Sequence, residues 1–117
     1  MNAAAKGELT DRCLRMIALV ESFPTIRRTS LDHQLDEYGD WDAVRFAKSW
    51  LCGSGGEKDA ALFVLSVWNP ETDWEDTAGL TRGGERGGFF NVHQALGNWD
   101  DGHRAAFLAW ARKPWWP

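Results

Sequence analysis

The feature that constrains this chain most is the apolar segment at residues 60–68, Ala-Ala-Leu-Phe-Val-Leu-Ser-Val-Trp, in which Ser66 is the single polar residue. An element without a polar face must be buried nearly all round. Nine residues fit a buried strand as well as a buried helix. The flanks favour a helix, because Ser54 and Glu57 have the spacing of a capping box and Pro70 follows the segment. We therefore predict a buried central helix at about 56–68.

The first turn of this central helix carries Glu57, Lys58 and Asp59. Three charged side chains in succession at the start of a helix are typical of a solvated turn. We therefore expect all three side chains to face water.

The rest of the chain carries narrower apolar stripes at helical spacing, each of which would pack one face against the central helix. They lie at residues 9–20, 31–38, 41–51 and 99–110, and helix-start signals predict two further short helices at 70–76 and 91–97. The pattern predicts an all-α, irregular bundle of five or six short helices. The pattern leaves one alternative open: residues 62–68 or 89–92 could form a strand instead.

At 117 residues the chain has room for one domain with a modest core. We expect a single helical domain over 1–117, with a frayed start at 1–7. Residues 79–88 are rich in Gly and Arg, which predicts a mobile loop. Residues 114–117, Pro-Trp-Trp-Pro, form an aromatic tail.

Tryptophan is unusually frequent, with eight residues in 117. Each ring supplies a large apolar area to the core, and each indole N–H needs a hydrogen-bond partner or water. Several rings should therefore lie at the boundary of the core. For Trp115 and Trp116 two interpretations remain open: they complete the core, or they are exposed as anchors for a partner.

Charge and targeting signals narrow the possible functions. The net charge is −4, with 8 basic and 14 acidic groups in residues 1–79 and 5 basic and 3 acidic groups in residues 80–117. Such a balance does not support non-specific DNA binding by the whole surface, nor is it acidic enough for a DNA mimic. The chain shows neither a signal peptide nor an apolar run long enough for a membrane span. We expect a cytoplasmic protein without membrane association, whose Cys13 and Cys52 are free and buried.

Catalytic and metal-binding patterns are weak in this sequence. His33, His93 and His103 have no recognised zinc spacing, and His103 falls on the apolar stripe at 99–110, which favours a place at the core edge. No phosphate-binding glycine motif or nucleophile with an identifiable base is present. We therefore expect no enzymatic activity, cofactor or metal. A small metal-dependent enzyme is retained as a third hypothesis.

The leading hypothesis is a non-enzymatic module that binds another protein or itself. Tryptophan in excess of core need, together with an aromatic terminus, is typical of an interaction surface. Trp74, Trp115 and Trp116 are the predicted anchors, with Arg82 and Arg86 on a mobile rim.

The alternative hypothesis is an accessory protein for single-stranded nucleic acid. Residues 82–88 contain two Arg-Gly-Gly units, and Phe89 and Phe90 follow them. Arginine pairs with phosphate while aromatic rings stack on bases, so Arg82, Arg86, Phe89 and Phe90 would form the binding set. A connector with solvated arginines explains the same residues.

Three segments of the second half carry a resemblance: Leu62–Asn69, Ala95–Trp110 and the closing Pro-Trp-Trp-Pro. They resemble small uncharacterised proteins of bacterial integrated or conjugative mobile elements. The resemblance implies a cytoplasmic bacterial protein that serves the element as an accessory. It implies no activity and no functional residues, because none is established for such proteins.

Overall fold

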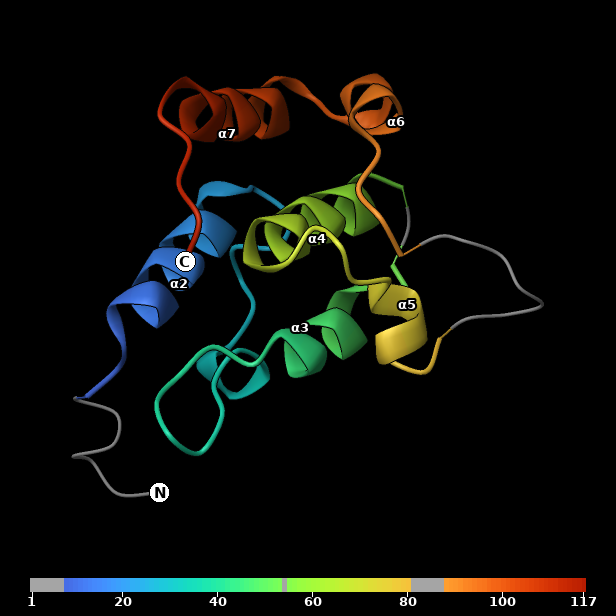
Figure 1. Ribbon diagram of the computed structural model, residues 1–117. Coiled ribbons are helices and arrows are strands. Elements are labelled where there is room, and N and C mark those ends of the chain that lie inside the picture. The colour runs from blue at the N-terminus through green and yellow to red at the C-terminus, as the bar shows by residue number, and fades with distance from the viewer. Residues whose placement is uncertain (1–7, 54, 81–87) are drawn as a thin grey trace.

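A computed structural model describes residues 8–53, 55–80 and 88–117. These residues form six α-helices and one 3₁₀ helix, with no strand beyond an isolated bridge between Leu35 and Trp41 (Figure 1). The elements are α2 (Asp11–Ser22), η1 (Leu31–His33), α3 (Ala43–Trp50), α4 (Gly55–Trp68), α5 (Trp74–Thr77), α6 (Val92–Asn98) and α7 (Asp101–Arg112). The all-α prediction is confirmed.

Helix α4 is the buried centre of the bundle. It contains the apolar segment 60–68, and every side chain from 59 to 65 is buried, as is Val67. Helices α2, α3 and α6 pack around it (Figure 1). The predicted central helix is thus confirmed, and the strand alternative for 62–68 is wrong. Residues 89–92 form no strand either: residues 89–91 are irregular, and α6 begins at Val92.

The first turn of α4 differs from the prediction. Asp59 is only 2% exposed, and Lys58 and Glu57 are half-buried. The turn is covered because α6 lies over it, a tertiary contact that local sequence does not encode. Ser54, the other half of the predicted capping box, lies outside the described residues.

Aromatic rings fill the space between α4 and α7. The Phe63 ring on α4 lies with its centroid 5.2 Å from those of Phe90, Phe107 and Trp110, and 5.7 Å from that of Phe23. Edge-on and tilted ring pairs at these distances contribute beyond the area they bury. Helix α7 therefore rests on α4 through large side chains instead of a close backbone approach.

The predicted role of tryptophan at the core boundary is confirmed. Three rings are buried and four are half-buried, and five indole N–H groups donate hydrogen bonds within the protein. The donors are Trp41 to Gln34, Trp50 to Thr29, Trp74 to the Asn69 carbonyl, Trp99 to the Gly56 carbonyl and Trp110 to the Trp115 carbonyl.

Both cysteines are free, but their surroundings differ. Cys13 is buried on α2, as predicted. Cys52 follows the end of α3 and is exposed, so its predicted burial is wrong. Burial, followed by the nearby Asp40 and Asp36 carboxylates, raises the pKa of the Cys13 thiol to about 11.

We expect the two thiols to react very differently with a thiol reagent at pH 8. Cys52 should be modified quickly, while Cys13 should react only as fast as the protein opens, because it is both shielded and almost wholly protonated. Labelling followed by mass spectrometry, with Cys52→Ser as the control, measures this. Two equally fast reactions would contradict the placement of Cys13.

Within residues 8–53, 55–80 and 88–117, no helix combines the length and the hydropathy that crossing a bilayer requires.

Candidate functional site

A groove between α2 and α7 is the best candidate for a functional surface. The two helices run in opposite directions along it, as contacts at both ends show. At one end, Pro24 after α2 lies so close to Gly102 that a Cβ at position 102 would come within 3.0 Å of the proline ring. At the other end, the Arg15 guanidinium lies over the Trp115 ring, 5.9 Å from its centroid.

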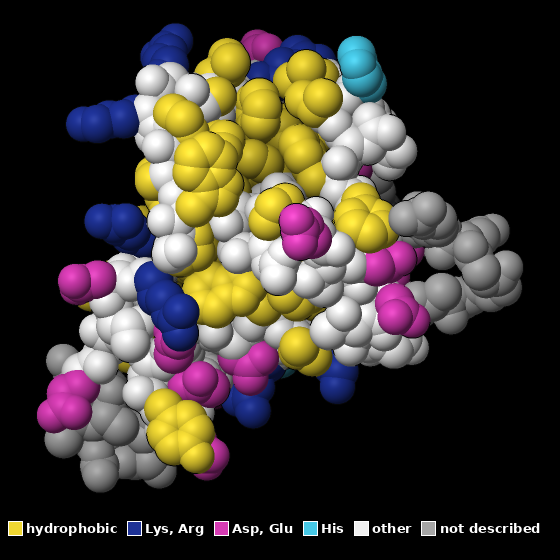
Figure 2. All heavy atoms as spheres, viewed as in Figure 1, with side chains coloured by type: hydrophobic (Ala, Val, Ile, Leu, Met, Phe, Trp, Pro, Cys, Tyr) yellow, Lys and Arg dark blue, Asp and Glu magenta, His cyan; other side chains and the backbone are white. Residues whose placement is uncertain are grey.

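The groove has a volume of about 560 Å³, and its lining is mainly apolar. Small alanines on both helices leave the space open, and aromatic side chains close one end. The lining residues are Arg15, Ala18, Leu19, Ser22, Ala106, Ala109, Trp110, Lys113, Pro114 and Trp115. Figure 2 shows hydrophobic side chains gathered over α7 and α2, with Lys and Arg side chains along one edge of this face.

The charged side chains that line the groove in the described part of the chain, Arg15 and Lys113, are both cationic. Both lie at the end where the chain leaves α7. Neither forms an ion pair with a described carboxylate, whereas Arg12, Lys58 and Arg104 each do. The groove therefore offers apolar surface and unneutralised positive charge together.

The C-terminal segment folds back over this end of the groove. The Trp110 indole N–H donates to the Trp115 carbonyl at 3.2 Å, and the Trp110 and Trp116 rings meet edge-on at 5.6 Å. Trp115 is half-buried against the core, while Trp116 is 59% exposed. The two rings of the tail therefore differ: Trp115 packs inward, and Trp116 faces water.

The structure does not bring the third predicted anchor, Trp74, to this surface. Trp74 is buried at 5% exposure, and its indole N–H donates to the Asn69 carbonyl. Its ring fills the core next to α4, so it offers no face to a partner. Arg82 and Arg86 lie outside the described residues.

The aromatic half of the predicted nucleic-acid set is engaged within the bundle. Phe90 is half-buried, and its ring packs against Phe63 and stacks on Trp99, with centroids 5.8 Å apart in the stacked pair. Phe89 is also half-buried and lines a hollow beside Asp59. A ring that is already packed has less surface left for stacking on a base.

A hydroxyl, an imidazole and a carboxyl group are connected in series at the start of α7. His103 Nε2 lies 2.8 Å from Thr25 Oγ1, and His103 Nδ1 lies 2.7 Å from Asp100 Oδ1. Hydrogen bonds from the His103 ring and backbone N–H lower the pKa of Asp100. His103 is buried, as its place on the apolar stripe predicts.

The order of these groups is that of a nucleophilic triad, but their exposure is reversed. The Asp100 carboxylate is 72% exposed, and the imidazole is packed between Phe23 and Trp99. Asp100 also caps α7 by accepting from the His103 backbone N–H. The arrangement ties the start of α7 to the segment after α2 and so fixes one end of the groove.

The buried Asp59 carboxyl group joins α4 to α6. It accepts from Asn98 Nδ2 at 2.8 Å and from Gln94 Nε2 at 3.3 Å. Asn98 and Gln94 are one turn apart on α6, so they reach the same carboxyl group from one helix face. Lys58, the neighbouring cation, is engaged with Glu75 at 2.8 Å.

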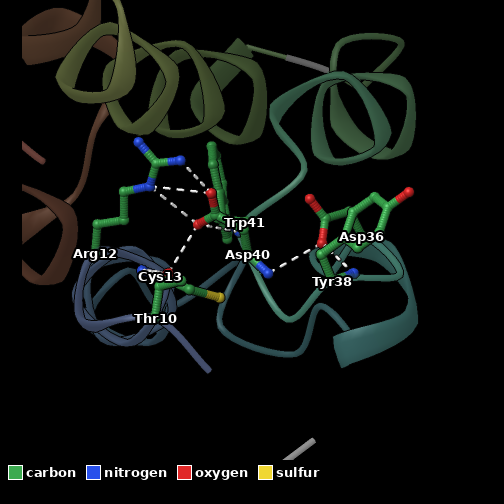
Figure 3. Close-up of polar contacts among 7 residues, drawn as sticks. All are labelled: Thr10, Arg12, Cys13, Asp36, Tyr38, Asp40 and Trp41. Carbon is green, nitrogen blue, oxygen red and sulfur yellow. Dashed lines mark hydrogen bonds and ion pairs between the residues drawn. The ribbon is translucent and has the colours of Figure 1, made fainter. Parts of the chain in front are cut away.

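Asp40 holds the start of α2 against the loop after η1 (Figure 3). Its carboxylate accepts from the Arg12 guanidinium, from Thr10 Oγ1 at 2.8 Å and from the Trp41 backbone N–H at 2.9 Å. Arg12 also lies over the Trp68 ring, 5.1 Å from its centroid. Burial raises the pKa of Asp40, but these hydrogen bonds outweigh it, so the pKa is lowered overall.

We expect Asp40→Asn to destabilise the protein near neutral pH by about 1 kcal/mol, because the partner Arg12 is largely exposed and water screens the pair. A carboxyl group with a lowered folded-state pKa contributes its stability above the ordinary pKa near 3.8 and loses it as the pH falls through the folded-state value. Urea unfolding at pH 7 and pH 3 should therefore show a smaller difference between wild type and variant at pH 3. An equal difference at both values would contradict the lowered pKa.

Among the residues that the structure describes, no group of three or more His, Cys, Asp or Glu side chains is placed to hold a metal ion. His33 Nδ1 lies 2.8 Å from Ser49 Oγ, far along the chain from His93 and His103.

No family model matches the chain, and comparison with curated proteins and with solved structures finds no match.

Proposed function

We propose that this protein is a non-enzymatic interaction module that binds a segment of another protein in the groove between α2 and α7. The observation that carries the proposal is an apolar groove of about 560 Å³ whose charged lining residues, Arg15 and Lys113, are cations without an ion pair to any described carboxylate. The apolar lining of the groove is exposed to water in the free protein, and a bound segment would bury it, which is energetically favourable.

The aromatic end of the groove supports the same function. Tryptophan is enriched among the interface residues that dominate binding energy. Trp116 is exposed at the end of the groove, where it meets Trp110 edge-on. Trp115 and Trp116 are therefore retained as anchors, whereas Trp74 stabilises the core.

Site-specific photo-crosslinking tests this proposal. A photoreactive amino acid replaces Ala109, which lines the groove, or Ala105, which is exposed on the same helix but does not line it. In cells that make the protein, we expect one dominant protein adduct from position 109 and at most weak, scattered adducts from position 105.

Three results would count against this function. The same adducts from both positions would show that the groove is not selective. An adduct with a second copy of the chain would mean that the groove mediates self-association and does not bind another protein. A nucleic-acid adduct at position 109 would favour the alternative hypothesis.

A further inference from the structure

We infer that the occupant of the groove is an amphipathic helix whose apolar stripe ends in Asp or Glu side chains, which lie between Arg15 and Lys113. This inference rests on the proposed function and names the chemistry of the partner.

The shape of the groove fits a third helix. Two antiparallel helices that diverge leave a trough along their length, and side-chain ridges of another helix pack into such a trough. The close contact between Pro24 and Gly102 holds one end of α2 and α7 together. The two helices have 12 residues each, so each presents about 18 Å to an occupant.

The lining sets the apolar side of the occupant. Ala18 on α2 and Ala109 on α7 leave room for large side chains, and Leu19 and Ala106 form the floor. Large aliphatic side chains at positions i, i+3 or i+4, and i+7 of a helix would enter this space from one face. Leu14 lies one turn before Ala18, and its half-exposed side chain extends the apolar side of α2.

The two cations at one end of the groove indicate which charges the occupant carries at that end. Arg15 and Lys113 lie on opposite sides of the same end of the groove and have no carboxylate partner among the described residues. The guanidinium of Arg15 is already positioned by the Trp115 ring. Acidic side chains on the occupant would gain two cationic partners there, whereas basic ones would be repelled.

The test uses two labelled model peptides of about 18 residues, long enough to follow either helix. Both carry leucine on one face. The first has glutamates at one end of that face, and the second has lysines at the same positions. Fluorescence anisotropy with the full chain should show the glutamate peptide binding about five- to tenfold more tightly, with a preference that weakens in high salt.

The double variant Arg15→Glu/Lys113→Glu should reverse this preference. Arg27→Glu/Lys48→Glu changes two exposed cations outside the groove by the same charge and should leave the preference unchanged. Circular dichroism checks that both double variants remain folded. If a double variant does not fold, the corresponding single variants are used.

The outcomes distinguish a failure of the inferred occupant from a failure of the proposed function. If both peptides bind equally and Ala109→Glu abolishes both, the groove binds helices but the acidic end is wrong. If neither peptide binds while position 109 still crosslinks to one protein, the occupant is not a helix of this kind and the inference falls, although the proposed function stands. If neither peptide binds and position 109 gives no specific adduct, both fall.

Discussion

Replacing Phe63 by alanine should lower the free energy of unfolding by about 3–5 kcal/mol. Phe63 is 2% exposed, and four aromatic rings contact it from three sides of the bundle. Alanine would leave a cavity that these rings cannot fill without moving α7. A loss of that size is a large share of the stability of a domain of this length.

Urea unfolding followed by tryptophan fluorescence and circular dichroism measures this effect. Phe63→Leu keeps much of the volume and should cost about 1 kcal/mol. Leu108→Ala removes a half-exposed leucine from α7 and should change the free energy by less than about 0.5 kcal/mol. If Phe63→Ala costs no more than Leu108→Ala, the aromatic layer does not hold α7 on α4.

The second large effect is expected at Asp59. Asp59→Ala removes the acceptor that joins α4 to α6 and should destabilise the protein by about 1.5–3 kcal/mol. The cost of burying the carboxylate offsets part of its hydrogen bonding, which keeps the value below that of a large core cavity. The Asn98 bond is shorter than the Gln94 bond, so Asn98→Ala should cost more than Gln94→Ala.

A double-mutant cycle isolates the contact. Asp59→Ala and Asn98→Ala should be non-additive, with a coupling of about 1–2 kcal/mol, because each single change already removes the shared hydrogen bond. Additive losses would mean that Asp59 acts on stability through something other than α6.

The sequence predicts the fold well because its signals are local. The apolar segment at 60–68 has no polar face, which requires a buried central element, and the stripes around it have helical spacing. Thr10 and Asn91 cap the helices that follow them through their side-chain oxygens. These interactions span three residues and can be recognised from one stretch of chain.

The groove could not be predicted, because it depends on contacts between distant segments. Pro24 and Gly102 are far apart in the chain, and so are Arg15 and Trp115, yet these contacts set α2 and α7 antiparallel. The same holds for Asp59, whose burial depends on α6. Local charge patterning predicts a solvated turn at that position, whereas the partners Gln94 and Asn98 lie 35 and 39 residues further along the chain.

Among the predicted anchors, local sequence could not separate Trp74 from Trp116. Both follow polar or proline-containing segments and carry the same ring. Trp74 begins α5 and turns inward, where the Asn69 carbonyl satisfies its N–H. Trp116 lies beyond the last helix and is 59% exposed. The difference arises from the position of each element relative to α4.

Amide mapping by nuclear magnetic resonance shows whether the groove between α2 and α7 receives a helix. The leucine–glutamate peptide is titrated into the isotopically labelled protein. We expect the largest shifts at Ala18, Ser22 and Ala109, together with the indole N–H of Trp110, and little change on α3. Shifts centred on α3 or α5, or no shifts at a saturating peptide concentration, would contradict the claim.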